Sequence, residues 1–255
     1  MVKSNGLAVI SGLGDFGGRM ERFNRRFLTT CVALTVLVSL FGGCKKNSTG
    51  PENPESSVIS ESNLFPFVAG RMYVYSAYTL DTTGVKLPSS THREATYIQG
   101  TATIGGKSGY RLIDSVYFTD GTFSYVDSSY FTVENGNLLT YQGAWITLFK
   151  PSAGIGAEYE GGSFTQTAFG VQVTVVVKCK ISAKETVTTN VGAFQAYKLE
   201  VKTTATFTGT TYQVLQYVWF ADGVGPIKQQ EPPQVDPIAG LKATGSESLL
   251  LSKNF

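Results

Sequence analysis

VQVTVVVKCKISAK, residues 171–184, decides the fold class of this chain. Apolar side chains stand at every second position of this stretch, and most of the positions between them are polar or charged. The apolar row is Val171, Val173, Val175, Val177, Cys179, Ile181 and Ala183. A period of two puts such a row on one face of an extended strand. The stretch therefore predicts a long β-strand with one dry face.

The same alternation continues from Phe65 onward, with β-branched and aromatic residues and frequent Gly, Asn and Asp, and without helical periodicity. Further strands are predicted near 71–81, 92–103, 108–119, 122–133, 138–142, 163–168, 194–207, 211–221, 226–230 and 246–252. Short connections pair neighbouring strands antiparallel. We predict an all-β domain over 64–255, an antiparallel meander curved into a barrel or half-barrel, because closure removes exposed sheet edges. A two-sheet sandwich is the alternative.

An export signal is predicted ahead of this domain. Arg22, Arg25 and Arg26 precede the apolar run FLTTCVALTVLVSLF, residues 27–41, which is short for a helix that spans about 30 Å of hydrocarbon. This anatomy predicts a helical signal peptide over residues 1–43, with Met20 as an alternative start. An uncleaved signal anchor is the other interpretation.

The end of that run, LFGGC at residues 40–44, resembles the lipobox of bacterial lipoproteins. The resemblance implies that Cys44 is lipidated and becomes the new N-terminus, so that the chain's membrane partner is reached through that lipid. Lys45 after the cysteine implies the outer membrane of the cell envelope. Residues 44–63 are then the lipidated cysteine and a flexible linker rich in Ser, Pro, Glu and Asn.

Charge and cysteine content exclude several classes of function. Five of the 21 basic and two of the 19 acidic side chains precede Cys44, which leaves a net charge of −1 on the rest. Such a domain lacks the basic footprint of a nucleic-acid-binding protein. Cys179 is the one cysteine after Cys44, so no internal disulfide is expected, and its place in the apolar row predicts a core side chain.

No cofactor or metal site is predicted. Gly12-Leu13-Gly14-Asp15-Phe16-Gly17 has the spacing of a dinucleotide-binding turn, but a signal peptide follows it instead of a βαβ unit. His92 is the only histidine and lies among polar residues, so a histidine-based zinc site is excluded by count. We predict a protein that is not an enzyme.

Asp120-Gly121 predicts a two-residue hairpin turn between the strands on either side of it. In that register Asp114 faces Asp127, with Tyr125 and Phe131 on the same side. Opposed carboxylates on a sheet share a proton, meet a cation or open onto water. The alternative is a bulge that sends Asp127 to the other face.

Large side chains on both faces of residues 211–220, TYQVLQYVWF, indicate a second apolar space, such as a ligand cavity or a partner surface. The candidate cavity residues are Asp114, Asp127, Tyr125, Phe131, Tyr217 and Trp219.

Three stretches together resemble an uncharacterised family of exported all-β bacterial domains, often lipoproteins: FPFVAGRMYVY at 65–75, VGAFQAYKLE at 191–200 and WFADGVGPIK at 219–228. The shape that the resemblance implies is similar to the half-barrel of lipoprotein carriers, which enclose acyl chains. We therefore expect a cell-envelope lipoprotein that binds an apolar or amphipathic small molecule without chemistry. A structural or protein-interaction module is the alternative, and a hydrolase using Asp114 and Asp127 comes third.

Overall fold

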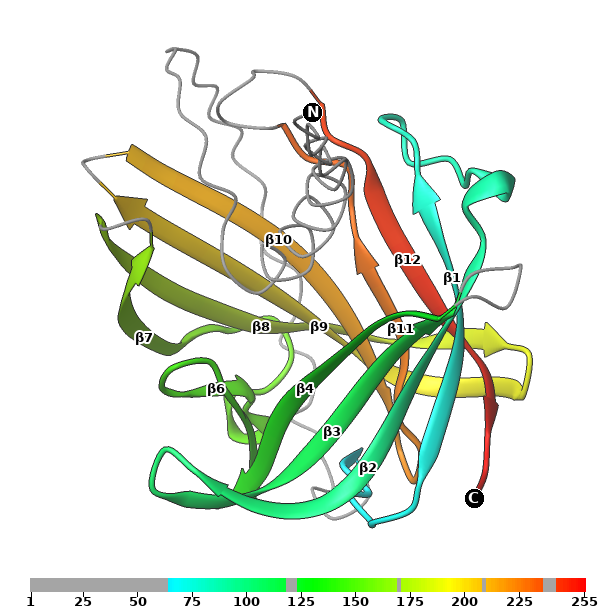
Figure 1. Cartoon of the computed structure of the whole chain (residues 1–255), viewed down its shortest axis with the longest axis horizontal. Coiled ribbons are helices and arrows are strands. Elements are labelled where there is room, and N and C mark those ends of the chain that lie inside the picture. The colour runs from blue at the N-terminus through cyan, green and yellow to red at the C-terminus, as the bar shows by residue number, and fades with distance from the viewer. Residues whose placement is uncertain (1–63, 118–122, 169–170, 208–209, 236–241) are drawn as a thin grey trace, which may run out of the picture. The chain divides into compact units, whose positions relative to one another are not determined.

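Twelve antiparallel strands form one sheet in the computed structural model, which describes residues 64–117, 123–168, 171–207, 210–235 and 242–255 (Figure 1). The strands are β1 (Met72–Leu80), β2 (His92–Ile104), β3 (Lys107–Tyr117), β4 (Phe123–Glu134), β5 (Asn137–Tyr141), β6 (Trp145–Phe149), β7 (Glu158–Ala168), β8 (Val171–Thr189), β9 (Gly192–Phe207), β10 (Thr210–Ala221), β11 (Gly225–Glu231) and β12 (Gly245–Lys253). Two 3₁₀ turns, Pro88–Ser90 and Pro151–Ala153, interrupt the connections. The predicted signal peptide, Met20, Cys44 and the linker lie outside the described residues.

The strands follow one another round the sheet in chain order, from β7 to β12 and then from β1 to β6. Because β1 pairs with β12, the two edges of the sheet are β6 and β7, which are neighbours in the chain. The sheet is therefore a nearly closed barrel. This confirms the all-β class and the antiparallel meander, and the single sheet excludes the sandwich. None of the described helical turns is long and apolar enough to cross a bilayer.

β8 contains the predicted strand 171–184 and continues five residues beyond it. Val173, Val175, Val177, Cys179 and Ile181 are buried, as their alternation predicts. An irregularity in the pairing with β9 lies between Ile181 and Ala183, and beyond it Val187, which pairs with Phe194, is buried on the opposite face from Ile181. Burial raises the pKa of the Cys179 thiol to about 12, which fits a core side chain rather than a reactive one.

Every strand except β6 overlaps a predicted stretch. β6 has only five residues, WITLF, and its apolar side chains do not alternate cleanly with polar ones. Such a short run carries too little periodicity to be recognised.

The segment before β1 closes one end of the barrel. Leu64 and Phe65 are buried. The Phe65 ring lies edge-on to Phe149 of β6 and to Phe220 of β10, with centroid distances of 5.5 and 5.2 Å. Phe149 and Phe220 also contact each other at 5.7 Å. Three segments far apart in the chain therefore share one aromatic cluster, and edge-to-face rings of this kind stabilise each other beyond the area they bury.

β6 is joined to β7 through side chains, since no ladder between these two strands is found in the described part of the chain. The Tyr159 hydroxyl of β7 donates a hydrogen bond to the Leu148 carbonyl oxygen at 2.7 Å and accepts one from the Lys150 amide at 3.0 Å. Burial raises the pKa of Tyr159 well above its usual value, so this hydroxyl keeps its proton at any ordinary pH. One side chain thus satisfies two backbone groups.

Close approach of the two backbones at this seam requires a glycine. A Cβ atom on Gly161 of β7 would lie 2.5 Å from the Thr147 carbonyl oxygen of β6. The same carbonyl oxygen lies 3.7 Å from the Cys179 Sγ of β8. β6 therefore leans over β7 towards β8 instead of extending the sheet.

Replacing Tyr159 by Phe tests the seam. We expect the free energy of unfolding to fall by about 1–2 kcal/mol, because two backbone groups lose their partner. Amide exchange of residues 145–150 should become faster, while exchange of β8 and β9 stays unchanged. Tyr97→Phe, which removes a more exposed hydroxyl, is the control. Equal exchange in both variants would contradict this account of the closure.

Candidate functional site

The register of the sheet defines which residues share the inner face of the barrel. One row of directly paired residues crosses seven strands and connects the buried row of β8 with β2: Ile181, Leu199, Val218, Gln229, Ser248, Ala77 and His92. Side chains at alternate positions lie on the same face. His92, Glu94 and Thr96 of β2 therefore belong to the inner face, together with Asp114 of β3, which pairs with Thr96.

Asp114 and Asp127 are directly opposed on β3 and β4, in the register that the Asp120-Gly121 hairpin predicts. The pairing changes only nearer the turn, between Val116 and Tyr117. The alternative with Asp127 on the other face is therefore wrong. Both carboxyl groups lie on the inner face.

Hydroxyl and amide donors hold this carboxylate pair. Thr96 donates to one oxygen of Asp114 at 2.5 Å, and Ser129 donates to the other at 3.2 Å. Asp127 accepts from the amide of Ser128 at 2.6 Å and is exposed. Two opposed negative charges repel each other less where water reaches one of them, because its high dielectric constant weakens the repulsion.

A second polar pair lies on the same face of β2. The His92 ring lies 3.0 Å from the Ser90 carbonyl oxygen and 3.2 Å from a Glu94 carboxylate oxygen. Both side chains are about one-fifth exposed. His92 therefore begins a strand and is partly buried, although it lies among polar residues in the sequence.

Aromatic rings share the face of the carboxylates. Phe131 of β4 pairs with Tyr110 of β3, and both lie on the face of Asp114 and Asp127, four residues away along each strand. Phe67, from the segment before β1, stacks on Tyr110 at 5.3 Å and on Phe131 at 6.0 Å. The inner face of β3 and β4 thus carries both apolar ring surface and carboxylates.

Three of the six candidate cavity residues belong to one hydrophobic cluster: Trp219 lies in its buried core, and Phe131 and Tyr217 pack against it. Asp114, Asp127 and Phe131 share the inner face, and Tyr125 pairs with Val116 in the same register, although its side chain lies outside the described part. By register Trp219 belongs to the row Trp219, Lys228, Leu249, Ser76 and Arg93. Its ring is nevertheless buried in the same hydrophobic cluster as Tyr75 and Leu112.

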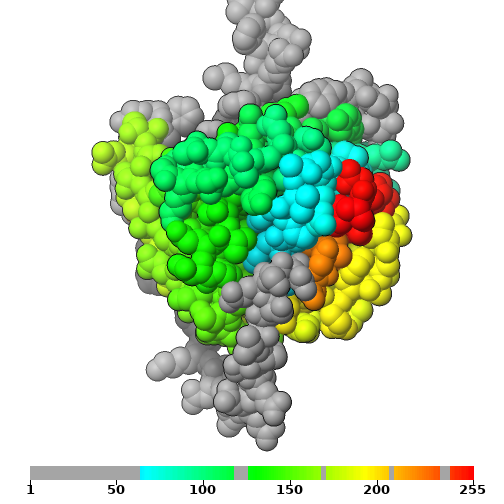
Figure 2. All heavy atoms as spheres, turned by 90° about the horizontal axis from the view of Figure 1, so that it is seen from below, coloured from blue at the N-terminus to red at the C-terminus, as the bar shows by residue number. Residues whose placement is uncertain are grey.

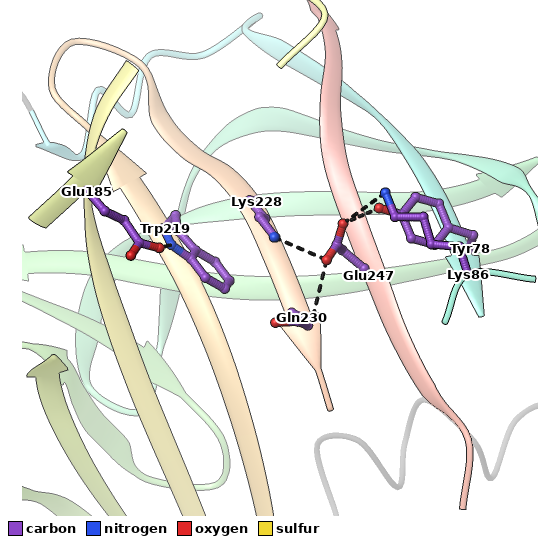
Figure 3. A network of polar contacts seen from close by, with 7 residues as sticks. All are labelled: Tyr78, Lys86, Glu185, Trp219, Lys228, Gln230 and Glu247. Atoms are coloured by element: carbon purple, nitrogen blue, oxygen red, sulfur yellow. Dashed lines mark hydrogen bonds and ion pairs between the residues drawn. The ribbon is translucent and has the colours of Figure 1, made fainter. Parts of the chain in front are cut away.

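Trp219 takes part in a set of polar contacts (Figure 3). Its ring lies beside the ammonium groups of Lys198 and Lys228, at 5.1 and 4.7 Å from the centroid. Its indole nitrogen donates to Glu185 of β8 at 2.5 Å. The ring is only 3% exposed and belongs to the hydrophobic core cluster, so its one polar atom needs the partner that Glu185 provides.

Glu247 of β12 connects the network to β1 and β11. Its carboxylate accepts from the Tyr78 hydroxyl, from Lys228 at 3.1 Å and from Gln230 at 3.2 Å, and it pairs with Lys86 at 3.3 Å (Figure 3). Burial alone would raise the pKa of Glu247, but the hydrogen bonds and the two lysines lower it below its usual value. The same contacts link β1, β12 and β11, which are adjacent in the sheet. Sequence reasoning missed this network because Glu247, Lys228 and Lys86 are far apart in the chain.

The three stretches noted for their resemblance meet at the closed end of the barrel. Phe65 of the first stretch contacts Phe220 of the third. The Tyr75 hydroxyl donates to the Pro226 carbonyl oxygen at 3.0 Å. A Cβ atom on Gly225, where φ is +97°, would lie 3.1 Å from the Tyr73 hydroxyl oxygen. This glycine is thus required by a left-handed backbone and a close contact.

Comparison with known proteins gives a partial family match. Residues 165–232 match the model of a family described as DUF3108-like. No protein with a curated description matches. Among the described residues, no group of three or more His, Cys, Asp or Glu side chains could hold a metal ion.

Two solved structures are similar in fold. One, provisionally described as a lipoprotein of Parabacteroides distasonis ATCC 8503, has 14% identity and a TM-score of 0.50, covering 75% of this chain and 98% of its own. The other, an exported protein of Bacteroides fragilis NCTC 9343 with a YmcC-like fold, has 13% identity and a TM-score of 0.44, covering 76% and 99%. The family match and the fold of the first structure confirm the predicted resemblance.

Replacing Glu247 by Gln tests the polar network around Glu247. We expect the free energy of unfolding to fall by about 2 kcal/mol near neutral pH, because two lysines lose a buried counter-charge. The folded-state pKa of Glu247 is lowered, so its contribution is present above about 4.5, the ordinary value, and disappears as the pH falls through the folded-state pKa. Urea unfolding of the two proteins should therefore converge at acid pH.

Glu134→Gln is the matched control, since the Glu134 ion pair with Lys107 is exposed. We expect that change to cost less than about 1 kcal/mol. A constant difference between wild type and Glu247→Gln at every pH would contradict the electrostatic account.

Proposed function

We propose that this chain is a lipid-anchored protein of the bacterial cell envelope that binds an amphipathic small molecule on the inner face of its barrel without catalysis. The observation that carries the proposal is the inner face of β3 and β4. There Asp114 and Asp127 lie on the same face as Tyr110 and Phe131, whose rings both stack on Phe67. Ligand sites combine apolar ring surface with a few polar groups that fix orientation.

The chemistry of the ligand follows from these side chains. The stacked rings of Phe67, Tyr110 and Phe131 offer contact to an apolar body. Asp127 is exposed and accepts from one backbone amide, so its carboxylate retains capacity to accept from a hydroxyl, amine or ammonium group. A molecule with an apolar body and a donor head fits both parts.

Hydroxyl groups fix the orientation of Asp114. Both of its carboxylate oxygens accept hydrogen bonds, from Thr96 and from Ser129. We propose that Asp114 contributes to binding, because a fixed polar group can orient a ligand.

Lipid anchoring in the outer membrane is the second part of the proposal. It is supported by the lipobox-like residues 40–44 and by Lys45 after the cysteine. It is also supported by the fold similarity to the Parabacteroides distasonis structure, which is itself described as a lipoprotein. A protein-interaction module is the second candidate, and the exposed apolar side chains on the outer face of β1 to β4 favour it.

Native mass spectrometry of the full chain, produced with its export signal and extracted from membranes in mild detergent, tests the ligand. We expect a bound small molecule in the wild type and about tenfold less in Asp127→Asn, because a charge-assisted hydrogen bond is weakened. Asp222→Asn, which removes an exposed charge from the β10–β11 turn, should retain the wild-type amount.

Equal loss in both variants, or a chain that carries no small molecule, would contradict ligand binding and favour the interaction module. The lipid on Cys44 is read in the same spectra from the mass of the chain, so anchoring and ligand binding are tested separately.

A further inference from the structure

The outer face of β1 to β4 carries a set of exposed apolar and aromatic side chains. Two rows of paired residues cross it: Met72, Tyr97 and Ile113, and then Val74, Ala95, Ser115 and Val126. Tyr117 lies beyond them, paired with Arg93. Met72, Tyr97, Tyr117 and Val126 are 36%, 42%, 39% and 49% exposed. We call these eight residues and Arg93 the β1–β4 face.

The strands that bear this face form a continuous surface, cyan to green in Figure 2. Soluble monomers rarely expose many large apolar side chains side by side, and such patches mark contact with a protein or a membrane. The exposure of this set therefore requires an explanation beyond the stability of the barrel.

The charges on this side of the barrel indicate which kind of partner the β1–β4 face would contact. Among the described outer-face residues of β1 to β4, three are basic, Arg93, Lys107 and Arg111, and one is acidic, Glu134. Glu134 is paired with Lys107 at the far end of the strands. The surface that remains combines tyrosine rings and arginines, which suits an anionic surface.

A lipid headgroup region matches this chemistry. Tyrosine rings favour the interface between hydrocarbon and water, and arginines reach phosphate groups while their stems lie on apolar surface. Anionic lipids attract basic side chains that come within a Debye length of them.

The described structure begins at Leu64, and the half-exposed Val68 is at most about 14 Å of extended chain beyond it. The Gly70 amide donates to the Ile98 carbonyl oxygen at 2.9 Å, which places this segment beside Tyr97. A flexible linker of the length of residues 44–63 spans roughly 25 Å. A lipid on Cys44 would thus hold the face within reach of the bilayer.

We propose that the β1–β4 face docks on the anionic leaflet to which Cys44 is anchored. This inference rests on the lipid anchoring of the proposed function and is independent of ligand binding. Docking orients the barrel with β2 and β3 against the headgroups and leaves β8 to β10 in water.

Depth-dependent fluorescence quenching on vesicles tests the orientation. The lipidated full chain, with Val126→Cys labelled by an environment-sensitive fluorophore, is reconstituted into phosphatidylethanolamine–phosphatidylglycerol vesicles that contain nitroxide lipid. The buried Cys179, with a pKa of about 12, should resist labelling. Gln213→Cys is the matched control, because Gln213 is exposed on β10, six strands away round the sheet.

We expect the probe at residue 126 to be quenched several-fold more than the probe at residue 213. Arg93→Gln should reduce the ratio of docked to undocked protein about fivefold on these vesicles, as expected for one basic side chain near an anionic surface. Tyr97→Ser should reduce it on vesicles of either charge.

Flotation of the vesicles separates the possible failures. A chain that floats but shows equal quenching at both positions is anchored and not docked, which overturns this inference alone. A chain that does not float contradicts the anchoring itself and the inference with it. A third outcome would be a probe at residue 126 whose emission reports an apolar environment even on vesicles without nitroxide lipid, and more so as the protein concentration rises. That result would show that a second copy of the chain covers the face, and it would overturn membrane docking.

Discussion

The packing of Phe65 against Phe149 and Phe220 is the contact on which the closed form of the barrel depends. β6 and β7 form no ladder with each other, so backbone hydrogen bonds cannot close the sheet at this seam. The Phe149 ring of β6 is instead held by a residue that precedes β1 and by one from β10. Aromatic packing therefore holds the two edges of the sheet together where backbone pairing is missing. The hydroxyl of Tyr159 bonds to two backbone groups at the seam, the Leu148 carbonyl oxygen and the Lys150 amide.

The two-residue period of a strand lets the same three strands present different chemistry on opposite sides. On β2 to β4 the inner face carries Asp114 and Asp127, and the outer face carries Tyr97 and Val126. Paired side chains stay on the same face from β1 to β3, because the pairing between Arg93 and Tyr97 contains no irregularity. A binding site inside and a docking surface outside therefore need no extra domain or loop, and a ligand held inside would lie close to the surface that faces the bilayer.

Sequence alone predicted the strands and one hairpin register but not the assignment of faces. Alternation marked β8, and Asp120-Gly121 placed Asp114 opposite Asp127, because both signals are local. Tyr217 and Trp219 were grouped with that pair because their strand is apolar on both faces. Pairing irregularities at Trp219/Phe220 and Ile181/Ala183 change which side chains share a face along β11 and β8. Their positions depend on partner strands distant in the chain, and no local pattern reports them.

The residues that carry the family resemblance lie where the barrel closes, and they do not indicate its function. The matched segment, residues 165–232, runs from β7 to the end of β11 and includes Phe220 and Gly225, which pack at the closed end. It contains neither the carboxylate pair nor any residue of the β1–β4 face. Aromatic residues and glycines of this kind are required by close packing and left-handed turns in any barrel built this way. A relative can therefore share all of them and still differ in ligand and docking surface, so function has to be argued from Asp127, Arg93 and Tyr97 in this chain.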